Sequence, residues 1–184
     1  MKKLYLIVMA AWVVAVAADD FPRTLFVENN LARTVSMMNL ETGAISNNVL
    51  QTGQVPNQIL SYRDQLFVLN SVPAEIMVFQ AVTRQLTARI VLPEGSNPYS
   101  MAMVGSNRLY VTLLVADAVA VVDVKEKRLL KLIECGKAPQ DVMVDGDRAI
   151  VTNTGGYPGY IASTVAFINT RNDSVLTRLA VPTN

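Results

Sequence analysis

Four prolines, each opening one copy of a repeated phrase, constrain this chain more than any other feature of its sequence. They stand 42, 41 and 43 residues apart, at Pro56, Pro98, Pro139 and Pro182. A glycine precedes each of the first three prolines by three residues, and an apolar run that includes a Val 12 or 13 residues after the proline follows. Because insertions between copies are nearly absent, the copies must fold into one repeated unit.

Each copy holds short apolar runs of 4–7 residues that are rich in Val, Ile, Leu and aromatic residues and bounded by turn residues, a pattern that predicts strands. After residue 18 no segment has a helical period, which HEAT or armadillo repeats of similar length would need. The sequence therefore predicts an all-β chain, a β-propeller of four-stranded antiparallel blades. The expected blades lie within residues 19–184, at about 24–55, 56–97, 98–138 and 139–181.

The N-terminus has the pattern of a secretory signal peptide. Lys2 and Lys3 precede the apolar run 4–16, and small residues at 15–18 offer a cleavage site, so we expect residues 1–18 to be removed. The run is too short to span a bilayer. We therefore expect a secreted, periplasmic or cell-surface protein with no membrane contact beyond export; an uncleaved N-terminal anchor is the alternative.

Charge and cysteine content exclude several function classes. Removal of residues 1–18 takes two of the 16 basic residues and leaves 14 against 15 acidic ones, a net charge of −1 without a basic face for nucleic acid. Cys135 is the only cysteine and cannot form an internal disulfide. The 184 residues contain no histidine, which removes histidine-based triads and metal clusters. No catalytic residue, metal ligand or cofactor is predicted.

The motif Ile150-Val151-Thr152-Asn153, the Gly-x-x-Pro turns and an Asp or Asn closing the third strand resemble the YVTN β-propeller repeat family of secreted and surface-layer-like proteins. The resemblance covers residues 24–184; Leu69, Gln80 and Leu179 depart from the pattern. The family usually builds about seven blades. The resemblance therefore implies either the N-terminal part of a longer propeller or an open arc that pairs through its edges. Copy 1 opens with a second-strand run at Leu25, so we expect its innermost strand to be missing.

One irregularity points to a binding face. In copies 1–3 the second apolar run starts eight residues after the Val, whereas in copy 4 it starts 14 residues later, and the six extra residues fall within 154–160. Strands alternate in direction, so this insert must emerge at the same end as the Gly-x-x-Pro turns, and inserts in repeat proteins often mark a binding face. The expected binding residues are Asn57, Tyr99, Gln140, Asn153, Tyr157 and Tyr160. The polar ones could equally satisfy turn backbone groups.

Three functions remain open at this stage. The first is a non-enzymatic exported binding or scaffold protein that recognises a protein, glycan or small molecule on its loop-rich face. The second is a hydrolase resembling the lactonase propellers, with a metal held by carboxylates in the central channel, although the predicted inner strands offer only Asp141. The third is a purely structural cell-surface module. Fold alone does not separate them.

Overall fold

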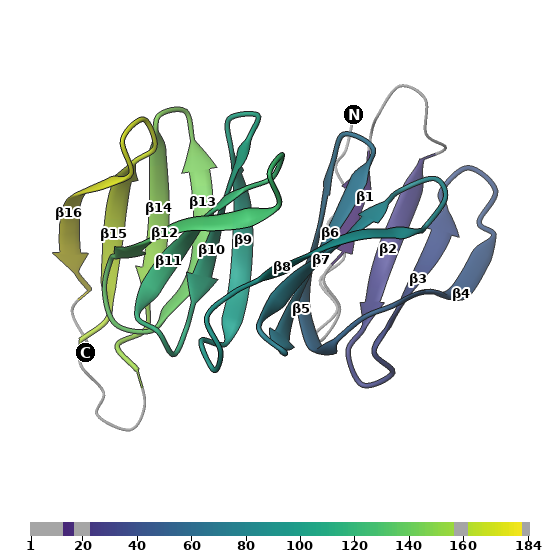
Figure 1. Ribbon diagram of the computed structural model, residues 1–184, viewed down its shortest axis with the longest axis horizontal. Coiled ribbons are helices and arrows are strands. Elements are labelled where there is room, and N and C mark those ends of the chain that lie inside the picture. Colours follow the sequence, from purple (N-terminus) through teal and green to yellow (C-terminus); the bar gives the residue numbers. More distant parts are fainter. Residues whose placement is uncertain (1–12, 17–22, 157–161, 182–184) are drawn as a thin grey trace.

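The computed structural model describes residues 13–16, 23–156 and 162–181, and within them the predicted all-β architecture is confirmed. Sixteen strands form four antiparallel sheets of four strands, each sheet built from consecutive strands (Figure 1). We call these sheets blades 1–4. The described residues contain no apolar helix of membrane-spanning length.

The strands follow chain order within each blade. Blade 1 contains β1 (Val13–Val16), β2 (Thr24–Asn29), β3 (Thr34–Asn39) and β4 (Ile45–Gln51). Blade 2 contains β5 (Gln54–Tyr62), β6 (Gln65–Val72), β7 (Glu75–Gln80) and β8 (Leu86–Val91). Blade 3 contains β9 (Pro98–Val104), β10 (Arg108–Leu113), β11 (Ala118–Asp123) and β12 (Arg128–Glu134). Blade 4 contains β13 (Pro139–Asp145), β14 (Arg148–Asn153), β15 (Thr164–Asn169) and β16 (Ser174–Ala180).

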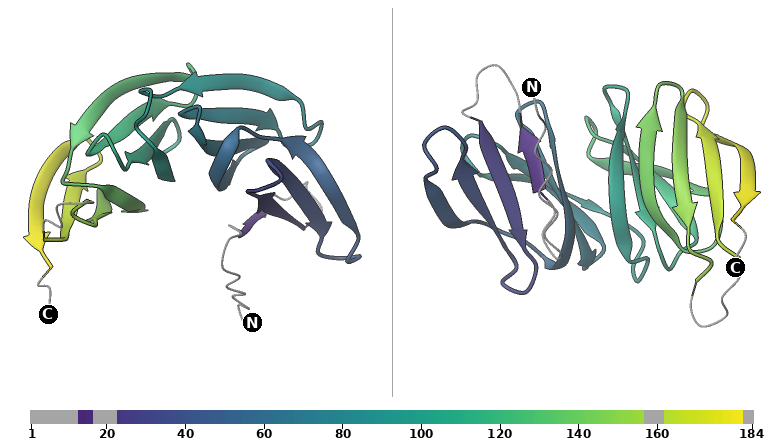
Figure 2. Two further views of the ribbon diagram at one scale, coloured as in Figure 1. Left: turned by 90° about the horizontal axis from the view of Figure 1, so that it is seen from below. Right: turned by 180° about the vertical axis from the view of Figure 1, so that it is seen from behind.

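The four blades stand side by side in an open arc (Figure 2, left). The first strands of successive blades contact one another, while β4, β8, β12 and β16 lie on the outer rim. Each junction between blades has its own hydrophobic cluster, centred on Phe26 and Leu66, on Phe67 and Leu109, and on Tyr110 and Val151. The core is therefore a series of three interfaces between blades.

Blade 1 contains a strand that the sequence did not lead us to expect. Val13–Val16, assigned above to the signal peptide, pairs antiparallel with β2 in the register Val13 to Val27. Blade 1 thus reaches beyond the expected range of 24–55. The physical reason is that the inner edge of β2 offers unpaired backbone groups, which an apolar extended segment satisfies.

The third strand of every blade ends in a residue that caps the following turn. The side-chain oxygens of Asn39 and Asp123 each accept two backbone N–H bonds, at 2.8–3.0 Å. Asn169 accepts one from Arg171, and Gln80 accepts one from Thr83 at 2.6 Å. The residue type can therefore vary, because what the turn needs is one side-chain acceptor.

Candidate binding face

The Gly-x-x-Pro turns and the loops between second and third strands lie at one end of the arc, as the sequence predicted. The register places Gln54 opposite Val72, Pro98 opposite Leu113, and Pro139 opposite Asn153. We call this end the turn face. It consists of residues 29–34, 53–57, 70–75, 95–99, 113–117, 136–140 and 153–156.

The residue before each of the first three repeated prolines has a left-handed backbone. Its φ is 51° at Val55, 51° at Asn97 and 50° at Ala138. Asn tolerates this conformation, whereas a β-branched residue such as Val rarely adopts it. Strained backbone of this kind concentrates at functional sites. Val55 is therefore a candidate residue of the turn face that the sequence did not predict.

Two of the turns are held by an asparagine from the end of the second strand. In blade 2 the Asn70 side-chain oxygen accepts the N–H of Gly53 at 3.0 Å. In blade 4 the buried Asn153 donates to the Cys135 carbonyl at 3.1 Å and to Thr164 Oγ1 at 3.0 Å. The glycines are needed because the asparagine fills the space of a side chain: a Cβ at residue 136 would lie 2.4 Å from Asn153 Nδ2.

Blade 3 lacks this clamp, since Leu113 stands where the other blades have asparagine. Gly95 there has φ 69°, and nothing lies within 4 Å of where its Cβ would be. The space opens into a shallow hollow of about 290 Å³ between blades 2 and 3, lined by Val55, Ser71, Val72, Gly95 and Asn97. Val55 and Val72 are 45% and 49% exposed, so the hollow has apolar walls that reach solvent.

A chain of hydrogen bonds fixes the polar residues beside the hollow. The predicted site residue Asn57 donates from Nδ2 to Ser71 Oγ at 2.6 Å and to the Pro98 carbonyl at 2.7 Å. Ser71 Oγ in turn donates to Asn97 Oδ1 at 2.7 Å. The sequence did not lead us to select Ser71 and Asn97. Leu113, which replaces the asparagine of the other blades, was the one signal that the junction between blades 2 and 3 differs.

The other predicted residues are spread along the turn face. Tyr99 is half-buried in β9, and Gln140, in the neighbouring β13, accepts a hydrogen bond from Thr112 Oγ1 at its backbone carbonyl, 3.2 Å away. Asn153 uses its amide on the Cys135 carbonyl in the segment that leads into its blade and on Thr164 within the blade. Tyr157 and Tyr160 lie outside the described residues. None of the predicted residues that the structure describes lines the hollow; Asn57 reaches it only through its hydrogen bond to the lining residue Ser71.

Solved structures of other proteins share the arrangement of the four blades. Hydrazine synthase of Kuenenia stuttgartiensis superposes with a TM-score of 0.77 at 18% identity, over 86% of this chain and 46% of its own. The virginiamycin B lyase of Staphylococcus aureus, as a catalytically inactive histidine-to-alanine variant with quinupristin, gives 0.71 at 15% identity over 99% of this chain and 60% of its own. Dihydro-heme d1 dehydrogenase NirN gives 0.68 at 12% identity over 94% and 38%.

The chain has a β-propeller fold. It spans about half the length of these structures, and at such identities the similarity establishes the fold alone. No family model matches the sequence, and no curated protein matches it.

The inner strands of the propeller are joined by polar side chains. Ser100 Oγ donates to Asp141 Oδ1 at 2.6 Å, and the side-chain oxygen of Gln58 accepts the N–H of Met101 at 2.5 Å. Asp141 also accepts the N–H of Val142 at 2.9 Å. Over residues 13–16, 23–156 and 162–181, no three His, Cys, Asp or Glu side chains gather as metal ligands would. The Ser100 to Asp141 and Met101 to Gln58 hydrogen bonds therefore join neighbouring blades.

One buried carboxyl has no structural counterpart in the other blades of the propeller. Glu28 lies on the same side of β2 as Phe26, toward blade 2, where its Oε1 makes no hydrogen bond within the described part of the chain. Burial raises the pKa of Glu28 to about 8. The equivalent residues are Leu69, Thr112 and Thr152. At neutral pH Glu28 is therefore mostly protonated.

Proposed function

We propose that this protein is an exported, non-enzymatic binding propeller that recognises a protein, glycan or small molecule on its turn face. The observation that carries the proposal is the hollow between blades 2 and 3, where the asparagine clamp is replaced and Val55 keeps a strained backbone. Among the three turns with this left-handed backbone, the turn beside the hollow is the one that places a β-branched residue there, where the backbone cost is greatest.

The lining indicates the kind of ligand. Val55 and Val72 offer aliphatic contact, and Asn97 offers a side-chain amide beside them. A ligand with a small aliphatic group and an adjacent hydrogen-bonding group fits this combination. Tyr157 and Tyr160 of the copy 4 insert lie outside the described residues; on the sequence alone they remain candidates for larger amphipathic contacts.

Catalytic functions have less support from the residues present. The lyase named above is inactivated by replacing a histidine, and the 184 residues here contain none. For a metal-dependent hydrolase, Asp141 of the inner strand β13 bonds to Ser100, and within the part of the chain that the structure describes no three His, Cys, Asp or Glu side chains gather as metal ligands. Export through cleavage after residue 17 or 18 and membership of the YVTN repeat family are part of this proposal, supported by the N-terminal pattern and the Ile150–Asn153 motif.

Titration calorimetry tests the binding face. The probes are a proline-rich hexapeptide, a chitin tetrasaccharide and quinupristin, each titrated into wild type, Val72→Asp and Val82→Asp. Val82 is a matched control because it is 59% exposed but lies in the β7–β8 turn, at the opposite end of the blade. We expect at least one probe to bind wild type and Val82→Asp alike and to bind Val72→Asp about tenfold more weakly. Binding that Val72→Asp leaves intact, or no binding of any probe, contradicts the proposal.

A further inference from the structure

The loops between second and third strands repeat one exposed aliphatic position. Leu31, Val72 and Val115 each stand seven residues after the first residue of β2, β6 and β10, and they are 99%, 49% and 64% exposed. Blades 2 and 3 have a neighbouring blade on both sides. The exposure of Val72 and Val115 is therefore a property of these loops within the arc.

Hydrogen bonds place the first of these loops beside the second. The Asn30 side chain, next to Leu31, donates to the carbonyl of Pro56 at 2.8 Å. Pro56 follows the half-exposed Val55, and Val72 lies directly opposite Gln54, on the other side of Val55 in the chain. The first loop thus meets the blade 2 wall of the hollow.

The third loop meets the opposite wall of the hollow. The N–H of Val115 donates to the Ser96 carbonyl at 2.9 Å, and Ser96 stands between the lining residues Gly95 and Asn97. An apolar surface that continues over several loops is typical of an interaction site. We call this surface the aliphatic row; it consists of Leu31, Val55, Val72 and Val115.

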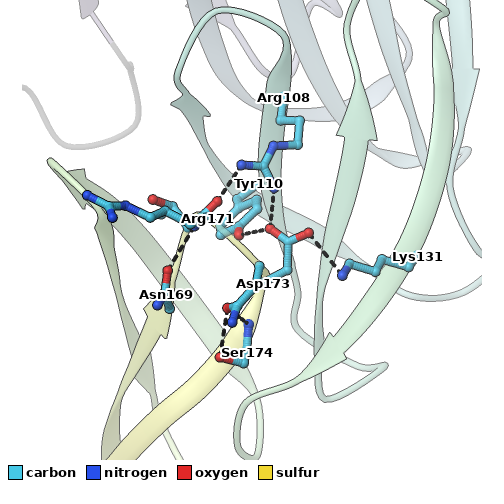
Figure 3. A network of polar contacts seen from close by, with 9 residues as sticks. Arg108, Tyr110, Lys131, Asn169, Arg171, Asp173 and Ser174 are labelled. Carbon is cyan, nitrogen blue, oxygen red and sulfur yellow. Dashed lines mark hydrogen bonds and ion pairs between the residues drawn. The ribbon is translucent and has the colours of Figure 1, made fainter.

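The opposite end of the blades does not repeat an aliphatic position in its described turns. Two residues after the capping residue, the third-to-fourth turns have Glu41, Val82, Lys125 and Arg171. Asp173, in the last of these turns, binds Arg108 at 2.5 Å and Lys131 at 3.0 Å (Figure 3). Polar contacts within the chain therefore join blades 3 and 4 at that end, whereas the row on the turn face is open to a partner.

The packing of the blades sets the step along the row. Sheets packed face to face lie about 10 Å apart, so successive loops present an aliphatic side chain about every 10 Å. A polyproline II segment rises about 3.1 Å per residue with three residues per turn, so every third side chain lies on one side, about 9 Å from the previous one. A β-strand would instead direct side chains to the row about every 7 Å.

A free amide beside the row favours this backbone over an α-helix. Asn97 Oδ1 accepts the Ser71 hydroxyl at 2.7 Å, while Asn97 Nδ2 makes no hydrogen bond to the part of the chain that the structure describes. A helix also repeats its face about every 10 Å, over seven residues, but its interior carbonyls are bonded internally. Polyproline II carbonyls have no internal partner, so they can accept the Asn97 amide.

The charges of the turn face favour an uncharged partner over an anionic lipid surface. Asp117 pairs with Lys137 at 2.5 Å, and Glu75 pairs with Arg89 at 2.5 Å. Among the described residues of this face, Arg33 is then the one charge without a salt bridge. Lipid-binding surfaces carry clusters of about four to eight basic residues.

We propose that the aliphatic row binds an extended, uncharged peptide segment in the polyproline II conformation, with an aliphatic side chain at every third residue. This inference rests on the proposed binding function of the turn face and names its class of ligand. Side chains at i, i+3 and i+6 contact Leu31, the pair of Val55 and Val72, and Val115 in turn. The Asn97 amide donates to a peptide carbonyl between the second and third contacts.

Titration calorimetry with two nonapeptides tests the spacing. One repeats Val-Pro-Pro three times, and the other has the same composition with its three valines consecutive. Both are acetylated and amidated, so neither carries a charge. In polyproline II the first directs its valines to one side and the second to three sides. We expect wild type to bind the spaced peptide at least about tenfold more tightly.

Two substitutions test whether the whole row takes part. Val115→Asp and Leu31→Asp should each weaken binding of the spaced peptide by about tenfold, since each removes one apolar contact. Val82→Asp is the control, because this exposed valine lies at the opposite end of blade 2. Circular dichroism and thermal unfolding check that each variant keeps its fold.

Asn97→Asp tests the polar contact. The carboxylate keeps an acceptor for Ser71 and tolerates the left-handed backbone at residue 97, but it has no N–H to donate. We expect about tenfold weaker binding of the spaced peptide. Unchanged binding would mean that the peptide backbone is not held by this amide and that the polyproline II assignment is wrong.

The outcomes separate this inference from the proposed function. Equal binding of the two nonapeptides, no binding of the spaced one, or binding that Val115→Asp and Leu31→Asp leave intact overturns the inference. The proposed function fails with it only if the hexapeptide, the chitin tetrasaccharide and quinupristin also do not bind. Co-sedimentation with phosphatidylserine vesicles that Val115→Asp abolishes would assign the row to a lipid surface and overturn the inference as well.

Discussion

Val55 is the residue at which backbone strain and surface exposure coincide. Its φ of 51° costs a β-branched side chain more than it costs Asn, which the next turn has at the equivalent position 97. Val55→Asn should therefore raise the free energy of unfolding by about 1 kcal/mol. Thermal unfolding of the variant measures this, with Val82→Asn as the control, because Val82 is also exposed but has no left-handed backbone. Equal effects of both changes would show that Val55 is not strained.

Glu28 should make stability depend on pH in the neutral range. Burial raises its pKa from 4.5 to about 8 in the folded chain, so between these values the folded state holds a proton that the unfolded state has lost. The stability that this protonation contributes is present below pH 4.5 and is lost as the pH rises toward 8, by up to about 1.4 kcal/mol per pH unit.

Glu28→Gln tests this directly, because the amide keeps the shape of the protonated carboxyl but does not titrate. Urea unfolding at pH 5, 6.5 and 8 should show the wild type weakening with pH and the variant changing much less. Parallel curves for the two proteins would mean that the Glu28 carboxyl is solvated or paired in solution.

At the scale of single elements, the Gly136 turn depends on its contact with Asn153. A Cβ at residue 136 would meet Asn153 Nδ2 at 2.4 Å, whereas one at residue 95 meets nothing within 4 Å. Both glycines have positive φ, so Gly95→Ala carries the backbone cost without the clash. Gly136→Ala should therefore lower the free energy of unfolding by about 1–3 kcal/mol more than Gly95→Ala. Equal losses would assign the requirement for glycine to the backbone alone.

The turn between β15 and β16 ties blade 4 to blade 3 through Asp173. Burial alone would raise the pKa of this carboxyl, but hydrogen bonds from Tyr110 and Lys131 and the charge of Arg108 hold it below its usual value. Asp173→Asn leaves two cations without their anion and should cost about 1–3 kcal/mol. Thermal unfolding at pH 7 measures the loss. Asp147→Asn is the control, since the Asp147 to Arg171 pair is exposed and should matter little.

The pH dependence of this contact has the opposite sign to that of Glu28. Because the folded pKa of Asp173 lies below 3.8, its contribution is present above that value and lost as the pH falls through the folded pKa. Wild type and Asp173→Asn should therefore converge in stability in acid. A difference that persists unchanged at low pH would mean that packing, not charge, accounts for the loss.

The sequence predicted strands and turns well where one local rule decides them. The spacing of Pro98 and Pro139 matches the first residues of β9 and β13. Gln80 departs from the sequence pattern of the repeat, yet its side-chain oxygen caps the following turn as that of Asn39 does. A comparison of residue types alone therefore missed this shared role. The hollow beside Gly95 could not be predicted, because it depends on how two blades meet rather than on any one repeat.

For the whole molecule, the repeat predicted the propeller fold but not two features of blade 1. The constant spacing specifies one blade, and blades with two apolar faces must stack, so the arc follows from the sequence. The buried Glu28 gives no periodic signal, because one acidic residue in a strand looks like a solvent-facing one. Similarly, the pairing of Val13–Val16 with β2 competes with the signal peptide expected from the same residues.

That competition yields the last prediction, which concerns the exported protein. Intact mass of the exported chain should show that residues 1–17 or 1–18 have been removed, because small residues at 15–18 follow a basic and then an apolar segment. Such cleavage removes Val13–Val16, so the inner edge of β2 loses its partner strand. Amide hydrogen exchange in β2 should then be faster in the exported protein than in the uncleaved 184-residue chain, while β6, in blade 2, exchanges alike in both. An exported protein that retains Met1 through Ala17 would instead make β1 a permanent strand of blade 1.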